Sequence, residues 1–158
     1  MNRIAYGLLI VLAASSPGAA DAQTRTDKTV LMSDRPGGRQ VQENYGFSDA
    51  VIAGDTIYLS GIVVGLAPGE TDLRPGLERA YRAIGQILKR AGAGYEDIVD
   101  VTSYHTDITT QIGPMSEVHK NYVKGPYPAW TAIDVDRLLP DTGLTEIKIV
   151  ARKPPPKP

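Results

Sequence analysis

Two side chains near the C-terminal end are candidates for chemistry. Glu146 opens an apolar segment directly after a loop, a position at which side chains often line sites, and its carboxylate can accept hydrogen bonds. Trp130 is the only tryptophan and lies in the stretch YPAWTAIDV. Residues after Pro128 alternate as in a strand, which predicts that Trp130 and Asp134 share a face. One strand face thus carries an aromatic ring and a carboxylate.

The two histidines give little support to a metal site. His105 lies near the end of a strand-like segment, and His119 lies on a helical segment, off the apolar stripe of Met115, Val118 and Tyr122. No H-x-H or H-E-x-x-H spacing occurs. The simplest interpretation is a strand-end histidine and a surface histidine. The sequence also has no nucleophile elbow, Walker loop or dinucleotide fingerprint.

Alternation and helical periodicity predict the elements that position these residues. Their expected order is strand, strand, helix, strand, helix, strand, strand. The expected strands cover residues 48–53, 56–64, 97–107, 129–135 and 144–153, and the expected helices cover residues 72–94 and 113–123, with Pro114 in the first turn of the second helix. Two helices on one face of a mixed sheet make an α+β layer fold. The bare face of that sheet needs a cover, for which a partner subunit is the obvious candidate.

The composition suits one globular domain. The chain has 158 residues, of which 42% are hydrophobic, and a formal net charge of -1, so a basic surface that recruits nucleic acid is not expected. The chain contains no cysteine, which excludes disulfides, a thiol nucleophile, a thiolate metal site and a lipid-modified cysteine. A fold of this size without disulfides would gain from forming an oligomer.

The N-terminus predicts export to the periplasm or secretion. MNRIAYGLLIVLAASSPGAADAQT has one basic residue, an apolar run and an A-x-A site, which together indicate a secretory signal peptide. We expect cleavage after Ala22, which leaves Gln23 as the first residue. The alternative is a buried N-terminal helix, but the serine, proline and glycine residues after the apolar run argue against it. We expect no membrane association after cleavage.

The expected divisions of the chain follow from these features. They are a signal peptide over residues 1–22, an arm over 23–44, a domain over 45–152 and a proline-rich tail over 153–158. The arm is polar and broken by RPGG, with one short strand expected at 29–32. The tail sequence KPPPKP can form neither a helix nor a central strand.

Five segments of the domain, in this order, resemble the RidA/YjgF family of reactive intermediate deaminases. They are YLSGIVVG, AGAGYEDIVDVTSYHTD, MSEVHKNYV, YPAWTAIDVDRLLP and TEIKIVA. The resemblance implies a chorismate-mutase-like fold and a homotrimer with clefts between its subunits. In the deaminase branch each cleft binds a small 2-imino or enamine acid and accelerates its hydrolysis to the 2-keto acid and ammonia. The resemblance implies no metal and no organic cofactor.

The resemblance also assigns site residues. Glu146 falls on the glutamate that positions or activates the water, and Ser60 and Gly61 fall on positions of the pocket wall. The other positions differ from the deaminases: Phe47 replaces a tyrosine, Ser116 replaces an asparagine, and Ala132 falls where many members have a cysteine. The pocket is therefore expected to be more apolar than in the deaminases.

Trp130 stands where the deaminases have the arginine that holds the substrate carboxylate. Tryptophan has one N–H donor and no charge, so it cannot replace a guanidinium that binds with two prongs. Loss of a desolvated charge-assisted pair costs about 2–5 kcal/mol. Arg137, in VDRLLP, is the nearest alternative arginine, but we do not expect it to reach the cleft from its loop.

Three functions remain open from the sequence. The first is imine hydrolysis with an altered preference, for an amine-derived imine without a carboxylate, with Glu146 as the base. The second is a non-catalytic periplasmic trimer that binds an apolar or ring-bearing small molecule in its clefts. The third is a structural or chaperone-like role. Some family members have been described as ribonucleases, but the nearly neutral charge provides no phosphate-binding patch.

Overall fold

The computed structural model describes residues 25–155, so the expected signal peptide and residues 156–158 of the expected tail lie outside the described part. In chain order the elements are β1 (Val30–Leu31), α1 (Gly38–Tyr45), β2 (Ala50–Ala53), β3 (Thr56–Leu59), β4 (Ile62–Val64), α2 (Arg74–Ala91), a short 3-10 helix (Tyr95–Asp97), β5 (Ile98–His105), α3 (Ile108–Tyr122), β6 (Ala129–Asp134) and β7 (Thr145–Arg152).

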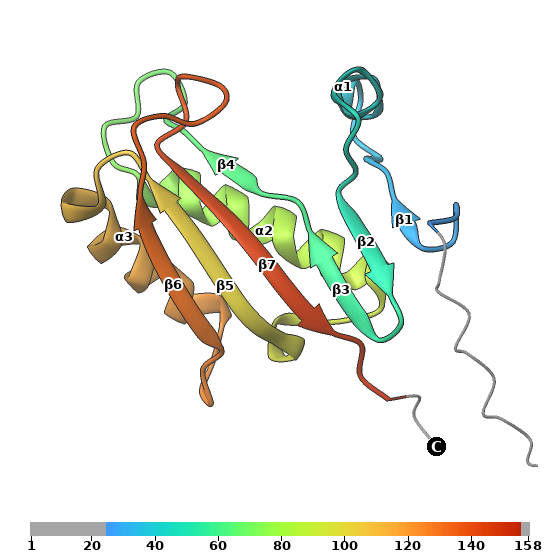
Figure 1. Ribbon diagram of the computed structural model, residues 1–158. Helices are drawn as coiled ribbons and strands as arrows, with labels where there is room; N and C mark the ends of the chain where they lie inside the picture. The colour runs from blue at the N-terminus through green and yellow to red at the C-terminus, as the bar shows by residue number, and fades with distance from the viewer. Residues whose placement is uncertain (1–24, 156–158) are drawn as a thin grey trace, which may run out of the picture.

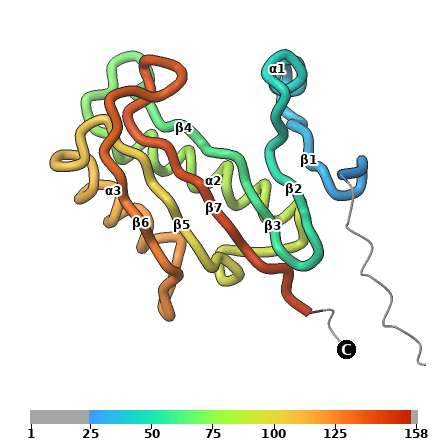
Figure 2. The backbone as a smooth tube through the Cα atoms, viewed as in Figure 1, coloured from blue at the N-terminus to red at the C-terminus, as the bar shows by residue number. Residues whose placement is uncertain are grey.

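The last strand, β7, organises the sheet. Seven strands form one sheet in the order β1-β2-β3-β7-β5-β6, and β4 also pairs with β7. The β5–β6 pair is parallel, whereas β7 runs antiparallel to β3, β4 and β5, so the sheet is mixed. The N-terminal strands and β6 lie at opposite edges of the sheet, as the tube in Figure 2 shows.

The helices α2 and α3 pack against the same face of the sheet (Figure 1). The apolar stripe expected on α2 is buried, because Leu77, Tyr81, Ile84 and Leu88 are all inaccessible to solvent. They meet the inward-facing residues of β7, Ile147, Ile149 and Ala151, which are also fully buried. The predicted α+β class, with two helices on one face of a mixed sheet, is thereby confirmed. Within residues 25–155 no helix covers the other face.

Strand register shows which residues face the helices. In β5 these are Val101, Ser103 and His105, each 0% exposed. Trp130 of β6 pairs directly with Val101, and Asp134 pairs with His105. Residues in direct register point to the same side of a sheet. Trp130 and Asp134 therefore share a face, as predicted, and it is the face that the helices cover.

The bare face carries the candidate carboxylate. Glu146 of β7 pairs with Tyr104 of β5, which in turn pairs with Ile133 of β6. These three residues alternate with the buried ones, so their side chains lie on the side without helices. Ile133 is 38% exposed. The bare face is thus partly apolar, which is the property that a covering subunit would need.

The arm is more ordered than the sequence suggested. The expected short strand is present as β1, but α1 was not predicted, and it spans the expected boundary between the arm and the domain. The glycines of RPGG read as helix breakers, yet Gly37 is the N-cap of this helix and Gly38 is its first residue. Gly37 and Gly46, which flank the helix, both have left-handed backbone. Gln42, at its centre, is 2% exposed. Tertiary contacts therefore stabilise a helix whose local sequence gives little sign of it.

Two further boundaries differ from the prediction. The single strand expected over residues 56–64 is interrupted at Ser60 and Gly61, which leaves β3 and β4 as separate strands. The second of the two expected helices is α3, which begins at Ile108, before residue 113 where its start was expected, so that Pro114 lies inside it. The hydroxyls of Thr109 and Thr110 donate to the Asp107 carboxylate at 2.6 and 2.8 Å. These contacts at Asp107 begin the helix earlier than the proline suggested.

Candidate functional site

Glu146 fills the space beside the break between β3 and β4. A Cβ atom placed on Gly61 would lie 1.6 Å from Oε1 of Glu146, closer than any real contact. The carboxyl group of Glu146 therefore occupies the space that a side chain at position 61 would need. Two residues of the expected site, which are far apart in sequence, are thus in contact.

The surroundings of Glu146 change its acidity. Burial raises the pKa of this carboxyl above its ordinary value, because desolvation disfavours the charged form. A raised pKa makes the carboxylate a stronger base and brings its titration closer to the pH at which the protein works, which favours general acid–base catalysis. The geometry therefore allows Glu146 to act as a general base or acid.

Ser60 and Phe47 extend the surface next to Glu146. The Ser60 hydroxyl donates to the carbonyl oxygen of Ser48 at 2.6 Å, and the Ser60 amide donates to the carbonyl oxygen of Asp49 at 3.0 Å. These bonds tie the strand break to the segment that begins at Phe47, whose ring is 44% exposed. We refer to Phe47, Ser60, Gly61 and Glu146 as the Glu146 group.

Trp130 is held on β6, the edge strand that follows β5 in the sheet. Its Nε1–H donates to Oγ of Ser103 at 2.9 Å. The indole also lies against the imidazole of His119, with ring centroids 4.9 Å apart and planes tilted by 34°. Trp130 is half-buried and packs against the hydrophobic core. The ring is therefore fixed by one hydrogen bond and one aromatic contact.

Ser116 and Ala132 lie on the same side as Trp130. Ala132 is exposed and pairs with Ser103 of β5, so it faces the helix layer at the open edge of the sheet. Ser116 precedes His119 by three residues on α3, which places both on one side of that helix. We refer to Trp130, Ala132 and Ser116 as the Trp130 group.

The two groups lie on opposite faces of one sheet. Glu146 points to the bare face and Trp130 to the helix face, and β5 separates the strands that carry them. The segment that holds Phe47 lies beyond β3, towards the far edge from β6 (Figure 1). Within one copy the sheet therefore lies between the two groups.

Both histidines are buried, which corrects the interpretation of His119 as a surface residue. His105 is 0% and His119 3% exposed, and desolvation lowers the pKa of both imidazoles. The Nδ1 atom of His119 lies 2.8 Å from the hydroxyl of Tyr81. His119 could not be placed from the sequence, because the helix presents a wider face to the sheet than its apolar stripe indicates.

Ser103 was missed by the sequence analysis. Its only signal was the S-x-H spacing with His105, which puts both side chains on one strand face. Nε2 of His105 lies 2.9 Å from Oγ of Ser103. Ser103 thereby links the candidate ligand-binding tryptophan to a buried histidine.

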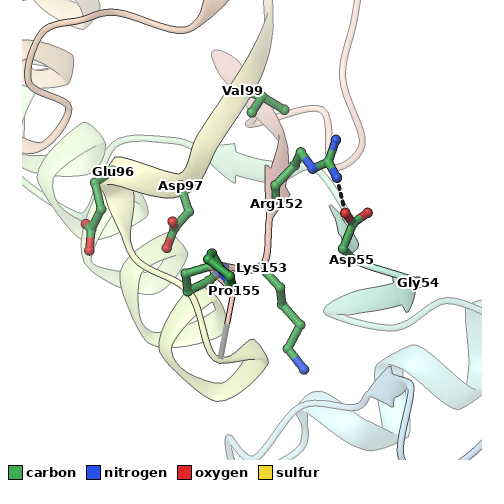
Figure 3. Close-up of a pocket in the computed structure, with 9 residues that line it drawn as sticks. Gly54, Asp55, Glu96, Asp97, Val99, Arg152, Lys153 and Pro155 are labelled. Atoms are coloured by element: carbon green, nitrogen blue, oxygen red, sulfur yellow. Dashed lines mark hydrogen bonds and ion pairs between the residues drawn. The ribbon is translucent and has the colours of Figure 1, made fainter. Parts of the chain in front are cut away.

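Other features of the described residues add no site to these two groups. Arg137 is exposed and its Nε atom lies 4.0 Å from Oδ1 of Asp141. Between residues 25 and 155 no three metal-ligating side chains cluster together, and none of the helices there is long and apolar enough to span a bilayer. A hollow of about 870 Å³ lies at the other end of β7, where Arg152 forms an ion pair with Asp55 (Figure 3). It contains none of the residues of either group.

Comparison with known proteins agrees with this geometry. The sequence model described as Endoribonuclease L-PSP matches residues 38–153. The chain is 35% identical over 124 residues to the RutC family protein YjgH of Escherichia coli, covering 75% of this chain and 92% of that one. It is 34% identical over 114 residues to the 2-iminobutanoate/2-iminopropanoate deaminase of Rattus norvegicus, covering 69% and 81%.

The fold is shared with solved structures. The crystal structure of Rv2704 from Mycobacterium tuberculosis, a member of the YjgF/YER057c/UK114 family, superposes with a TM-score of 0.67 at 27% identity and covers 78% of this chain and 98% of that one. Sequence match and fold thus agree over the whole domain. The chain belongs to the RidA/YjgF family, which the Endoribonuclease L-PSP model describes.

Proposed function

We propose that the protein hydrolyses imines or enamines in clefts between the subunits of a homotrimer, in the manner of a 2-iminobutanoate/2-iminopropanoate deaminase but with a different substrate. The Glu146 group of one subunit meets the Trp130 group of its neighbour in each cleft. The observation that carries the proposal is the carboxyl of Glu146, which is set against Gly61 with its pKa raised by burial. Deaminases among the relatives supply the reaction class.

The proposed reaction needs only water and a proton carrier. Water adds to the C=N bond, its oxygen bonding to carbon while a proton reaches nitrogen, and the carbinolamine then releases ammonia or an amine and leaves a carbonyl. Glu146 takes the proton from the attacking water and returns one to the departing nitrogen. No change of oxidation state occurs, and no metal or cofactor enters the scheme.

Trp130 is the reason to expect a different substrate. The deaminase position for a guanidinium holds an uncharged indole, whose one N–H already donates to Ser103. A substrate carboxylate would find no charged partner from this residue, and its desolvation would go uncompensated. We therefore propose that the substrate is an imine without a carboxylate, such as one derived from a primary amine. Export to the periplasm, proposed from residues 1–22, fits a substrate outside cytoplasmic amino acid metabolism.

A second candidate function is a non-catalytic trimer that binds a small ligand in the same clefts. The engagement of the Trp130 N–H by Ser103 favours it, because a wall of this kind supports binding by apolar contact alone. This second candidate differs from the hydrolase only in the role of Glu146, which shapes the pocket without transferring a proton.

Imine hydrolysis by the protein purified from the full-length chain tests the proposal. Imines without a carboxylate come from an amine oxidase acting on primary amines, and 2-imino acids come from an amino acid oxidase. Loss of the imine and release of ammonia are followed in both series. The parent is expected to accelerate the first series, and Glu146→Gln to lose that activity. Trp130→Arg is expected to move the preference towards the 2-imino acids.

Each outcome of this assay separates the candidates. Turnover that Glu146→Gln leaves unchanged would contradict the catalytic role of Glu146. Absence of turnover in the parent, together with saturable binding of an amine or imine, would favour the non-catalytic trimer. A parent that prefers 2-imino acids would contradict the altered specificity.

A further inference from the structure

Trp130 is the first residue in a series of hydrogen bonds on the helix-covered face of the sheet. The series passes from Trp130 Nε1 to Ser103 Oγ and His105 Nε2, each step 2.9 Å. His105 Nδ1 then lies 3.5 Å from Thr145 Oγ1, which is 3.2 Å from Gln111 Oε1. Beyond Gln111 the last contacts, in order, are Gln111 Nε2 to Thr106 Oγ1 at 3.2 Å and Thr106 Oγ1 to the Leu144 carbonyl at 3.1 Å.

One direction gives every contact in this series a donor and an acceptor. The indole N–H can only donate, and the carbonyl of Leu144 can only accept. In this direction Ser103 accepts from Trp130 and donates its own proton to Nε2 of His105. His105 then carries its own proton on Nδ1 and donates it to Thr145, whose hydroxyl donates to Gln111. The opposite tautomer would leave Nδ1 competing with Gln111 for the single Thr145 proton.

Burial decides what Ser103 and His105 can do. A serine hydroxyl hydrogen-bonded to an imidazole resembles an activated nucleophile, but both side chains are 0% exposed. No substrate can reach them from solvent. Their contact with Trp130 is therefore a means of holding the indole, and they belong to the layer behind the site.

We propose that Ser103, oriented by His105, is a positioning residue that fixes Trp130 so that its ring and not its N–H faces the ligand. The inference rests on the proposed location of the ligand site and deepens it, because it names the ligand class. One indole side contacts His119, so the remaining half-buried ring is the surface left for binding. The face of an indole carries negative electrostatic potential and attracts cations. The site therefore takes ring-bearing amines or imines, neutral or protonated, and discriminates against carboxylates.

Two probes that share a benzene ring test this ligand class. Benzylamine carries a positive charge and benzoate a carboxylate, and the single tryptophan makes fluorescence emission a direct report from Trp130. Benzylamine is expected to change the emission saturably, with an affinity about tenfold or more above that of benzoate, as a cation–π contact of the usual size implies. Equal affinities, or tighter binding of benzoate, would overturn the proposal.

Ser103→Thr and Ser103→Val form a matched pair for the positioning role. Threonine and valine have nearly the same shape and both suit a strand, but only threonine keeps the hydroxyl. Ser103→Val is expected to weaken benzylamine binding about 2- to 12-fold, the range for one lost hydrogen bond, and to shift the emission of Trp130. Ser103→Thr is expected to preserve both values. If the two variants behave alike and keep the parental preference, the hydroxyl does not position Trp130.

The proton arrangement gives a test without any substitution. The imidazole ¹⁵N chemical shifts of the parent are expected to show His105 neutral and protonated on Nδ1. A proton on Nε2 would overturn the proposed direction of the series, even if Ser103→Val did not fold. This inference and the proposed function can also fail separately. Benzylamine binding at Trp130 without imine turnover would remove the hydrolase and keep the ligand class, whereas Glu146-dependent turnover with no response of Trp130 would do the reverse.

Discussion

At the residue scale, the contact between Gly61 and Glu146 can be tested without removing the carboxyl group. In Gly61→Ala the new Cβ would meet the carboxyl of Glu146, which is the end of a flexible side chain and can rotate away. Turnover is expected to fall to the level of Glu146→Gln, because catalytic groups tolerate little displacement. The free energy of unfolding is expected to change by less than about 1 kcal/mol. Steady-state kinetics and urea denaturation measure the two effects.

Gly85→Ala is the control for that prediction. Its Cβ would lie 2.3 Å from the hydroxyl oxygen of Tyr95, which donates to the carbonyl of Tyr81 at 2.6 Å. This clash involves two partly buried residues on the helix side of the sheet, the side away from Glu146. Stability should therefore fall while turnover per folded molecule is kept. If Gly61→Ala instead lost stability and kept its activity, the proposed role of the close contact would be wrong.

The buried histidines predict a decline of stability in mild acid. Desolvation lowers the folded-state pKa of His105 and His119 from the ordinary value of 6.5. Below pH 6.5 the two histidines are therefore protonated in the unfolded chain while they stay neutral in the folded one. The free energy of unfolding then falls as pH falls. Each histidine contributes a slope of up to about 1.4 kcal/mol per pH unit. Glu146, whose pKa is raised, contributes with the opposite sign.

Urea denaturation between pH 7 and about 5 measures this slope, since most carboxyl groups titrate at lower pH. His119→Gln should remove the part of the slope that comes from His119, and Glu146→Gln should steepen the slope. A stability that stays constant over this interval in the parent and in Glu146→Gln would show that neither histidine is desolvated as the structure has it.

Sequence reasoning placed Glu146 better than the residues around Trp130. Glu146 begins a strand with clear alternation, so its side and its strand-end position could be predicted. Its contact with Gly61 could not, because it depends on the break between β3 and β4. The hydrogen bonds from Trp130 to Ser103 and from Ser103 to His105 could not be predicted either. Alternation groups Ser103 with His105 but does not tell which face of the sheet the helices cover.

At the element scale, α1 shows how a tertiary contact overrides a weak local pattern. Gln42 accepts the amide N–H of Ser33 at 2.7 Å and donates to the Asp49 carboxylate at 2.6 Å. Arg90, in the last turn of α2, lies 2.8 Å from the other oxygen of that carboxylate. The arm is thus anchored to the helix layer through Asp49, which is 8% exposed. None of these long-range partners can be inferred from the polar sequence of the arm.

This anchor predicts unequal effects for two arginines of α2. Arg90→Ala leaves the buried Asp49 carboxylate without its cation and should cost about 2 kcal/mol, below the cost at a fully buried pair because Arg90 is partly exposed. Arg82→Ala removes a largely exposed guanidinium that lies 3.6 Å from Glu78 and should cost less than about 0.5 kcal/mol. Denaturant unfolding measures both, and hydrogen exchange of α1 should accelerate in Arg90→Ala alone. Equal costs would contradict the anchor.

At the scale of the whole molecule, the sheet keeps the two groups of the proposed site apart within one copy. Its helices cover one face, which leaves Glu146 on the bare face, while Trp130 lies under the helix layer at the far edge. In the proposed trimer a second copy covers the bare face and places its own Trp130 group near Glu146. In the proposed trimer the same contact buries the exposed ring of Phe47 and the apolar residues of the bare face.

Complementation between two inactive variants tests this arrangement. Glu146→Gln and Trp130→Ala are each expected to abolish turnover of the carboxylate-free imine. When equal amounts are mixed through unfolding and refolding, some clefts will pair the intact Glu146 of one variant with the intact Trp130 of the other. Random assembly restores about one quarter of the clefts, and hence about one quarter of the parental activity. If the groups act within one copy, the mixture stays inactive even though native mass spectrometry, which resolves the lower mass of Trp130→Ala, shows mixed trimers. The inter-subunit site must then be abandoned.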